Sequence, residues 1–405
     1  MARNDEITED VHFHKTVTFR AWKHELKFRT SQALFSSHDI DTGTRFLLRT
    51  IVEAGYRPFK SILDIGCGYG PLGITLKILC PESAVHLTDR DALAVEYSRR
   101  NAELNGLTGV EVYGSLGYDD ITRNDFDLII SNIPGKAGEP VVAYLLREAR
   151  FYLAPGGTAA IVVVSPLEKT VVKILAETPG AETVLRRNRS GHAVFHYRFT
   201  GERPPKPGPS AFERGVYRRK DAAMRLDKLE YAMQTAYGMP EFDSLSYDTE
   251  ILLKALKDIK KEIRRAVAFN PGQGHVPVVL WKLLRPRNIT IVDRDLLALR
   301  YSKLNLILNG CPAESVSPFH RVGLDMENRG DIDLVAGVLR DENKDAVRLT
   351  FDRAAELISP GGMIVLSGSS TPVTRLVTHA ETKENLVIKS RQRRRGYSLL
   401  VLEKV

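Results

Sequence analysis

The sequence predicts an α/β protein made of two tandem units with doubly wound, mostly parallel sheets, the second unit being a degenerate copy of the first. Apolar runs typical of strands alternate with helical segments, which is the order that parallel sheets require. The block DRDALAVEYSRRNAELNG at 89–106 returns without a gap as DRDLLALRYSKLNLILNG at 293–310. A proline-rich stretch at 201–210, GERPPKPGPS, separates the two copies. A repeat of this length indicates a duplicated domain and not a solenoid unit.

Length and composition restrict the class of protein. A chain of 405 residues suits two or three domains, each large enough to bury its own core. A hydrophobic share of 43% and a charged share of 27% are ordinary for a soluble globular protein. The formal net charge of +8 favours a polyanionic partner, with nucleic acid as the first candidate, although many proteins without such a partner are mildly basic.

The sequence carries no sign of a metal site, a disulfide framework or a membrane segment. Its three cysteines form no CxxC pair and no Cys/His cluster. The first residues lack the apolar stretch of a signal peptide, and no run approaches the length that crosses a bilayer. We therefore expect a cytoplasmic protein with no metal and no membrane partner.

The first copy contains the elements of one complete sheet, in chain order. Residues 11–30 are rich in β-branched and aromatic residues and predict a pair of strands. A polar turn and an amphipathic helix follow, and then a buried strand runs into a glycine-rich turn and a second helix. Further strands are predicted at AVHLTD, VEVYGS, DFDLIISNIP, GGTAAIVVVS and VFHYRF, with a helix from about 92 to 105 after the first of these.

The same order restarts after the linker. VAFNPGQG at 267–274 corresponds to the glycine-rich turn of the first copy, and DIDLVAGVLR at 331–340 corresponds to DFDLIISNIP. The segment DAAMRLDKLEYAMQTAYGM, which precedes the second copy, has helical apolar spacing, and its place in the fold stays open. We expect a first unit at 1–200, in which 1–30 is a strand extension, a linker at 201–238 and a degenerate unit at 239–405.

A ligand site is predicted where the first buried strand ends. Gly66, Gly68 and Gly70 let the chain turn sharply and let a ligand approach the backbone without a Cβ in the way. Asp89 ends the next strand, where its carboxylate can accept hydrogen bonds from both hydroxyls of a ribose. The spacing differs from the dinucleotide GxGxxG pattern, and no P-loop lysine follows. A tight structural turn is the alternative for the glycines alone.

The turn resembles the GxGxG turn of class I S-adenosylmethionine-dependent methyltransferases, whose fold is Rossmann-like. In that family it packs against the methionine and ribose parts of the cofactor. The resemblance implies that Asp64 lies near the cofactor's amino group, and fold position places the adenine near the end of the third strand. The cofactor-binding residues so implied are Asp64, Gly66, Cys67, Gly68, Gly70, Asp89, Arg90, Ser115, Leu116 and Asn132.

The fourth strand ends in SNIPG at 131–135, the predicted methyl-acceptor site. Amino methyltransferases that act on planar nitrogens commonly carry Asn-Pro-Pro-aromatic at this place. The asparagine amide oxygen and a following main-chain carbonyl accept hydrogen bonds from an exocyclic NH2 group, which turns the nitrogen lone pair towards the methyl group. We therefore predict Asn132, Ile133 and Pro134 as catalytic residues. An asparagine that only caps a turn is the alternative.

The motif departs from the usual pattern at two positions. Ile133 replaces the first proline, and Gly135 replaces the aromatic residue whose ring would stack on the base. Tyr69, Phe35 or Tyr118 could supply this ring, and the sequence does not choose between them. The missing ring also motivates a second hypothesis, in which the acceptor is a protein side-chain amide or a small molecule.

Several motifs together resemble one bacterial family. ALFS at 33–36, DTGT at 41–44, the glycine turn, Asp89, the NAELNG helix end and SNIP are similar to the tandem-domain ribosomal RNA guanine-N2 methyltransferases of the small- and large-subunit type. The resemblance implies S-adenosylmethionine as cofactor, ribosomal RNA or a ribosomal subunit as partner, and guanine N2 as the methyl acceptor. In the familiar members the degenerate copy comes first, whereas here it comes second.

The second copy lacks the residues assigned to chemistry in the first. Ala268 replaces Asp64, and Asn270 replaces the first glycine of the turn. VLR at 338–340 stands where the first copy has Asn-Ile-Pro, whereas Asp293 keeps the ribose-type carboxylate. We therefore expect catalysis only in the first copy, with residual cofactor binding in the second left open. A third hypothesis treats both copies as scaffolds of a non-catalytic RNA-binding protein.

A basic run, RQRRR at 391–395, is the remaining feature of the second copy. It predicts either a phosphate-binding patch or a solvated hairpin tip, and both interpretations stay open. The first copy carries Arg186, Arg187 and Arg189 in the corresponding stretch. Both halves therefore present cations at a corresponding place.

Overall fold

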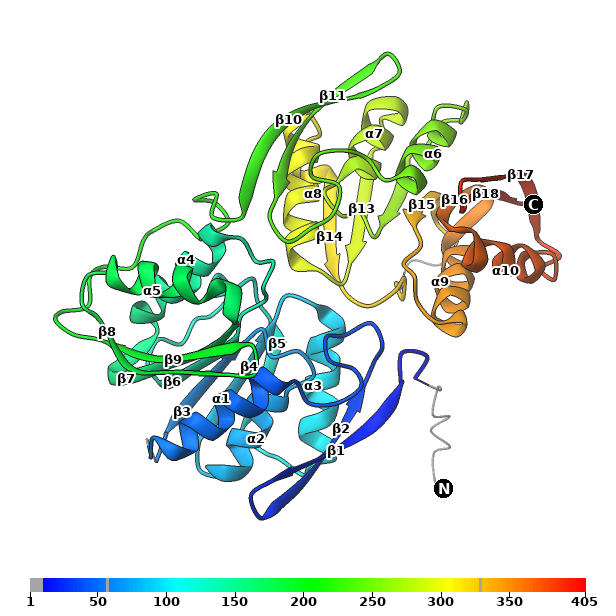
Figure 1. Ribbon diagram of the computed structural model, residues 1–405. Coiled ribbons are helices and arrows are strands. Elements are labelled where there is room, and N and C mark those ends of the chain that lie inside the picture. Colours follow the sequence, from blue (N-terminus) through cyan, green and yellow to red (C-terminus); the bar gives the residue numbers. More distant parts are fainter. Residues whose placement is uncertain (1–9, 56–57, 328–329) are drawn as a thin grey trace.

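The computed structural model describes residues 10–55, 58–327 and 330–405, and within them each half of the chain forms one seven-stranded sheet (Figure 1). The first sheet has the order β5 (Val110–Gly114), β4 (Ala84–Asp89), β3 (Ser61–Ile65), β6 (Phe126–Asn132), β7 (Leu153–Val164), β9 (His192–Phe199) and β8 (Ala181–Arg189). The second has β14 (Val316–His320), β13 (Asn288–Asp293), β12 (Arg265–Phe269), β15 (Ile332–Val338), β16 (Ile358–Ser369), β18 (Tyr397–Lys404) and β17 (Leu386–Arg394). The orders are equivalent, which confirms two tandem Rossmann-like units.

Helices cover both faces of each sheet, because neighbouring residues of a buried strand face opposite sides. Ile62 of β3, for example, packs into the core on one face and Leu63 into the core on the other. The first face carries α1 (Thr42–Glu53), α2 (Pro71–Leu79) and α3 (Ala92–Leu104), and the second carries α4 (Glu139–Glu148) and α5 (Glu168–Ala176). Their counterparts in the second unit are α6 (Tyr247–Leu256), α7 (His275–Leu284) and α8 (Leu296–Leu308), then α9 (Lys344–Leu357) and α10 (Ser370–Ala380). Short 3-10 turns are η1 (Ala149–Phe151), η2 (Ser165–Leu167) and η3 (Ala313–Ser315).

An antiparallel hairpin precedes each sheet. β1 (Lys15–Ala21) and β2 (His24–Thr30) are the strand pair predicted at 11–30. β10 (Arg218–Leu226) and β11 (Leu229–Ala236) repeat this pair before the second sheet. The segment predicted as a linker at 201–238 therefore contains a hairpin of the second unit, and the connection proper is shorter.

The helical spacing expected in this segment is wrong. Tyr231 and Met233 are buried and alternate with exposed Glu230 and Ala232, which is the period of a strand with one buried face. Alanine, methionine and glutamate favour helices, so the local composition conceals the alternation. Packing of the hairpin on the second unit decides the structure against this propensity.

An asparagine of the repeat holds each hairpin on the neighbouring helix. Asn101 of α3 is fully buried, accepts a hydrogen bond from Arg29 N at 2.7 Å and donates to Arg29 O at 3.0 Å and to Tyr69 O at 2.9 Å. Asn305 of α8 makes the same three bonds, with both backbone groups of Gln234 and with the turn of its own unit. The asparagine four residues further on pairs with the hairpin backbone in each copy. The shared asparagines therefore belong to the scaffold.

The two units meet through the same short segment of each copy. The backbones at 90–92 and 294–296 exchange two N–H···O=C hydrogen bonds of 2.7 and 3.0 Å. Two ion pairs of 3.3 Å cross the contact in the same reciprocal way, Arg90 with Asp295 and Arg294 with Asp91. The contact follows directly on Asp89 and its repeat Asp293, so each ribose-type carboxylate lies beside the junction.

A shared hydrophobic core reinforces this junction. Leu297, Ala298 and Tyr301 of α8 are buried within the core cluster of the first unit. Tyr217, from the segment that connects the units, is buried in the same cluster. The second unit thus completes the core of the first.

The described residues contain neither a membrane-spanning helix nor a cluster of metal ligands. Within the described ranges, no helix combines the length and the apolar character needed to cross a membrane. The His, Cys, Asp and Glu residues of the same ranges form no group of three that could hold a metal ion. All three cysteines are buried and free.

We expect Asn101→Ala to loosen the β1–β2 hairpin. The substitution leaves the backbone groups of Arg29 and Tyr69 without partners, which should lower the stability of this contact by about 2–3 kcal/mol. Hydrogen exchange followed by mass spectrometry should show faster exchange in β1 and β2. Asn305→Ala is the matched control and should accelerate β10 and β11 instead. Unchanged exchange in both hairpins would contradict the scaffold role.

Candidate functional site

The predicted site residues of the first unit gather at one edge of its sheet. Asp64 lies in β3, Asp89 ends β4, Ser115 follows β5 and Asn132 ends β6. These strands are parallel neighbours, so their carboxyl ends meet at the same edge. This edge is where open α/β sheets bind ligands.

The glycine turn leaves open space above the first two glycines. Gly66 has φ 72° and Gly68 has φ 59°, and a Cβ on either would meet no described atom within 4 Å. Gly70 differs from these two. It is the N-cap residue of α2 with φ 92°, and a Cβ there would lie 2.6 Å from Ile74 Cδ1. The first two glycines therefore admit a ligand, and the third allows close packing of the helix.

Asp64, in the strand before this turn, has one buried carboxylate oxygen without a hydrogen-bond partner among the described residues. Its Oδ2 accepts a hydrogen bond from Gly73 N at 2.9 Å, and its Oδ1 is buried with no hydrogen-bond partner among the described residues. Burial raises the pKa of Asp64 to about 7, the Gly73 hydrogen bond opposes this, and Asp89 adds to it. An unpaired buried acceptor is costly, and a cationic donor would satisfy it. The amino group of S-adenosylmethionine fits this requirement.

Asp89 is held by the turn itself. Its Oδ2 accepts from Gly68 N and its Oδ1 from Asp91 N, both at 2.9 Å. Burial raises the pKa of Asp89 to about 6 despite these hydrogen bonds. One hydrogen bond per oxygen leaves further lone pairs on both, so the carboxylate can still accept from ribose hydroxyls.

The other predicted cofactor residues have different surroundings. Ser115 and Leu116 are buried, and the Ser115 hydroxyl donates to Gly117 O, so they can form a wall but offer no free side-chain donor. Cys67 is buried beside Ser98 Oγ at 3.4 Å, and burial raises the pKa of its thiol well above the usual value. The Arg90 side chain is directed to the second unit, where it also donates to Gly238 O. Direct cofactor contact by these residues stays a prediction.

Asn132 is oriented by the N-terminus of α1. Its Nδ2 donates to Asp41 Oδ2 at 3.0 Å and to Thr44 Oγ1 at 3.2 Å. A carboxylate can only accept, so the amide nitrogen must face Asp41. The amide oxygen of Asn132 is thereby directed away from Asp41 and can accept a hydrogen bond from a substrate.

Asp41 itself caps α1 and accepts from Thr44 N at 3.1 Å. A Cβ on Gly43 would lie 2.9 Å from Asp41 Oδ2 and 2.8 Å from the ring of His192, so this position requires glycine. Sequence reasoning used the Asp-x-Gly-Thr motif only for the family resemblance and missed its contact with Asn132. The Asp-x-Gly-Thr motif was the available signal for a functional role of Asp41. Its contact with Asn132 could not be read from the sequence, because the two residues lie far apart in the chain.

The two residues after Asn132 have side chains in different surroundings. The Ile133 side chain is buried in the core, and its N–H donates to Val162 O at 3.0 Å. Pro134 is exposed, and its carbonyl accepts from Ala137 N at 3.1 Å. Main-chain carbonyls are therefore what these two positions can offer a substrate.

The structure separates the three rings that could replace the missing aromatic residue. Tyr69 is buried and donates its hydroxyl to Ser36 O at 3.1 Å. Tyr118 is buried and stacks on Tyr152 with 4.5 Å between ring centroids. Phe35 is 74% exposed and belongs to the loop that leads to Asp41. Of the three, Phe35 alone has a ring that a base can reach.

The corresponding edge of the second unit is filled by its own side chains. Arg340, at the position of Pro134, forms an ion pair with Asp293, the repeat of Asp89. Asn270 donates through Nδ2 to Val338 O at 2.9 Å. Ala268 replaces the carboxylate that would face an amino group. This edge is unsuited to the ligand that the first unit fits.

Comparisons with known proteins agree with this geometry. The family model described as methyltransferase small domain matches residues 25–195. The uncharacterized protein YbxB of Bacillus subtilis is 33% identical over 150 residues, which are 37% of this chain and 74% of YbxB. Ribosomal RNA small subunit methyltransferase C of Haemophilus influenzae is 35% identical over 159 residues, which are 37% of this chain. Its counterpart from Serratia proteamaculans is 36% identical over 169 residues, which are 41% of this chain. The chain covers 47% of each methyltransferase C protein.

Among solved structures, the chain is similar to the 16S rRNA N2 guanosine methyltransferase RsmC of T. thermophilus in complex with AdoMet and guanosine. The match has a TM-score of 0.68 and 17% sequence identity, and it covers 97% of this chain and 99% of that one. At this identity the likeness shows a common fold, which extends over both units.

We expect the chain to bind one S-adenosylhomocysteine, at the first unit. In the second unit, Arg340 occupies the carboxylate that a ribose would need. Isothermal titration calorimetry should give a stoichiometry near one, and Asp89→Ala should abolish binding. A stoichiometry near two, or binding that survives Asp89→Ala, would count against this assignment.

The raised pKa of Asp64 predicts opposite effects of pH on stability and on binding. Because its pKa rises from 3.8 to about 7 on folding, the folded state keeps a proton that the unfolded chain has lost between these values. The stability of the free protein should therefore fall as the pH rises from about 4 to about 7. Cofactor affinity should rise from about pH 6 to about pH 8, because the cofactor's ammonium group prefers the carboxylate form. Thermal melting with and without S-adenosylhomocysteine checks both trends. Asp64→Asn should remove the changes above about pH 6 and leave the part of the stability loss that Asp89, with its pKa raised to about 6, causes at lower pH.

Proposed function

Because the chain belongs to the methyltransferase small-domain family, we propose that its first unit methylates the exocyclic N2 of a guanine in ribosomal RNA. S-adenosylmethionine is the methyl donor of this enzyme. In the proposed division of labour, residues 1–200 carry the reaction, and the degenerate unit is 239–405 together with the β10–β11 hairpin. A ribosomal RNA substrate would place the protein in the cytoplasm.

The residues at the sheet edge are assigned to the cofactor by their unused bonding capacity. Asp64 Oδ1 would bind its amino group, and Asp89 would accept from its ribose. Gly66 and Gly68 would let it approach the backbone, and Ser115 would help to wall the adenine. The bound cofactor supplies an electrophilic methyl group on a sulfonium, so the chain mainly has to position the acceptor and exclude water.

The oriented amide of Asn132 is the observation that carries the proposal. Asp41 and Thr44 hold its nitrogen, so its oxygen can accept one N–H of an exocyclic amino group. The carbonyl of Ile133 is the candidate acceptor for the other N–H. Two such bonds would fix the amino nitrogen with its lone pair towards the methyl group. When the N–C bond forms and the C–S bond breaks, the nitrogen releases one proton and S-adenosylhomocysteine leaves.

An RNA substrate is supported by three further observations. The relatives from Haemophilus influenzae and Serratia proteamaculans are named for methylation of small-subunit ribosomal RNA. The net charge of +8 suits a polyanion. The exposed ring of Phe35 can stack on a base that has left its helix, as base-modifying enzymes require.

We expect the protein to transfer labelled methyl groups to ribosomal RNA transcribed in vitro, which carries no modification. Asn132→Ala should lower kcat/KM by about 100-fold or more, because it removes an acceptor that positions the nucleophile. Its affinity for S-adenosylhomocysteine should change less than tenfold. Asn188→Ala, an exposed asparagine of β8, is the matched control and should keep full activity.

The same assay tests the acceptor. Phe35→Leu should raise KM for RNA by about tenfold, and Phe35→Tyr should restore it, because stacking on a base is worth about 1–3 kcal/mol. Nuclease digestion should release the label as N2-methylguanosine. Label that stays on protein after nuclease treatment would favour the amide-acceptor hypothesis, and tight cofactor binding without any transfer would refute the proposed function.

A further inference from the structure

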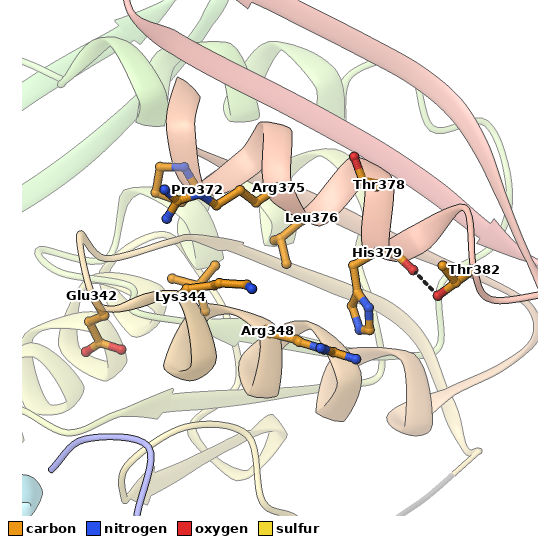
Figure 2. A pocket seen from close by; sticks show the side chains of 10 residues that line it. Glu342, Lys344, Arg348, Pro372, Arg375, Leu376, Thr378, His379 and Thr382 are labelled. Atoms are coloured by element: carbon orange, nitrogen blue, oxygen red, sulfur yellow. Dashed lines mark hydrogen bonds between the residues drawn. The ribbon is translucent and has the colours of Figure 1, made fainter.

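A cationic cleft lies in the second unit, far along the chain from the residues assigned to methyl transfer. It has a volume of about 320 Å³ and separates the N-terminal part of α9 from α10 (Figure 2). Lys344 and Arg348 reach into it from α9, and Arg375 and His379 from α10. Glu342 lies at one end and Thr382 at the other. The proposed methyl transfer does not involve these residues.

The positive charge of the cleft is not neutralised from within. In the part of the chain that the structure describes, Lys344 and Arg375 are exposed and form no ion pair with a carboxylate. Asp352 is already bound to His379 at 2.7 Å and to Lys383 at 3.0 Å. A cleft with two uncommitted cations attracts an anion.

The other acidic group is also committed. Glu342 lies 3.5 Å from Nη1 of Arg294, at the junction between the units. Arg348 is only weakly paired, with 3.9 Å to Asp352 Oδ2. Three cations of the cleft thus remain available to a polyanionic ligand.

The basic run noted in the sequence contacts α10, one of the two helices that form the cleft. Arg391 of β17 donates to Thr374 Oγ1 of α10 at 3.5 Å, so the run lies against a helix that forms one wall. Arg393, Arg394 and Arg395 continue it along β17 into the turn before β18, where all three are exposed. Further exposed cations therefore lie on the strand that contacts α10.

Two contacts connect residues beside the cleft to the first unit, and one of them reaches the loop that carries Phe35. Asn343, which caps α9 directly before Lys344, donates to Val11 O at the start of the first unit. Arg294, the partner of Glu342, donates through Nη2 to Ala33 O at 3.0 Å, two residues before Phe35. The cleft and the Phe35 loop therefore border the same junction between the units.

We propose that this cleft binds backbone phosphates of the RNA substrate and thereby aligns the strand for entry of the target base. The inference rests on the proposed function. Lys and Arg side chains are the usual ligands of RNA phosphates. No phenylalanine, tyrosine or tryptophan is among the described lining residues, and the one ring there, that of His379, is bound to Asp352. Recognition here is accordingly of the backbone and independent of sequence.

The test combines Lys344→Gln, Arg348→Gln and Arg375→Gln in the full chain. The control combines Lys60→Gln, Lys228→Gln and Arg287→Gln, which removes the same charge at exposed positions elsewhere. Fluorescence anisotropy with a labelled fragment of small-subunit ribosomal RNA measures binding without turnover. We expect the cleft variant to bind about tenfold or more weakly, and its salt dependence to lose about two units of slope, as three lost phosphate contacts predict. The control should keep the wild-type affinity.

The outcomes separate this inference from the proposed function. A raised KM for RNA with nearly unchanged kcat, and rescue of binding by the charge-preserving set Lys344→Arg, Arg348→Lys and Arg375→Lys, would support phosphate contacts. If the wild-type protein transfers no methyl group but the cleft variant still loses RNA binding, phosphate binding by the cleft would be supported and guanine methylation would be refuted. Equal RNA binding by the cleft variant and the control would refute the proposal that the cleft binds RNA phosphates. If the triple variant does not fold, Arg375→Gln alone carries the same comparison.

Discussion

The reciprocal contact between residues 90–92 and 294–296 is the constraint on which the rest of the molecule depends. It joins the two copies through their most similar segment, directly after Asp89 and Asp293. Arg294 uses this position to touch Asp91, the Phe35 loop and Glu342 at once. The guanidinium of Arg294 therefore connects the junction, the Phe35 loop and a residue of the cationic cleft. The proposed path of the RNA runs along this arrangement.

The repeat separates the residues that maintain the fold from those that act on a ligand. Asn101 and Asn305 make equivalent hydrogen bonds to their hairpins, so their identity is explained by the scaffold alone. Asp64 and Asn132 have no equivalents, and each offers unused bonding capacity at the sheet edge. In the second unit, Arg340 forms an ion pair with Asp293, so this carboxylate is no longer available to a ligand. The positions at which the copies differ therefore include the residues proposed for the chemistry, whereas the shared asparagines support the fold.

The fold could be predicted from local pattern, and the same kind of pattern singled out the residues that we propose for the cofactor. The glycine turn, Asp89 and the strand alternation are visible within short windows, and duplication confirms them. The contact of Asn132 with Asp41 could not be read in this way, because it joins residues far apart in the chain. The β10–β11 hairpin was hidden by helix-favouring composition, and its strands are set by packing against the second unit. The choice of Phe35 over Tyr69 needed burial, which no local pattern supplies.

The shared core has a consequence for how such a chain can change over time. Leu297, Ala298 and Tyr301 belong to the degenerate unit, yet they fill the interior of the unit for which we propose the cofactor site. Removing the degenerate unit would expose that interior to water, so its loss is penalised even though its own ligand edge is blocked. A duplicated unit can thus be retained without a ligand site of its own, because it forms part of the hydrophobic core of the other unit. Its outer surface is then free to acquire new binding roles.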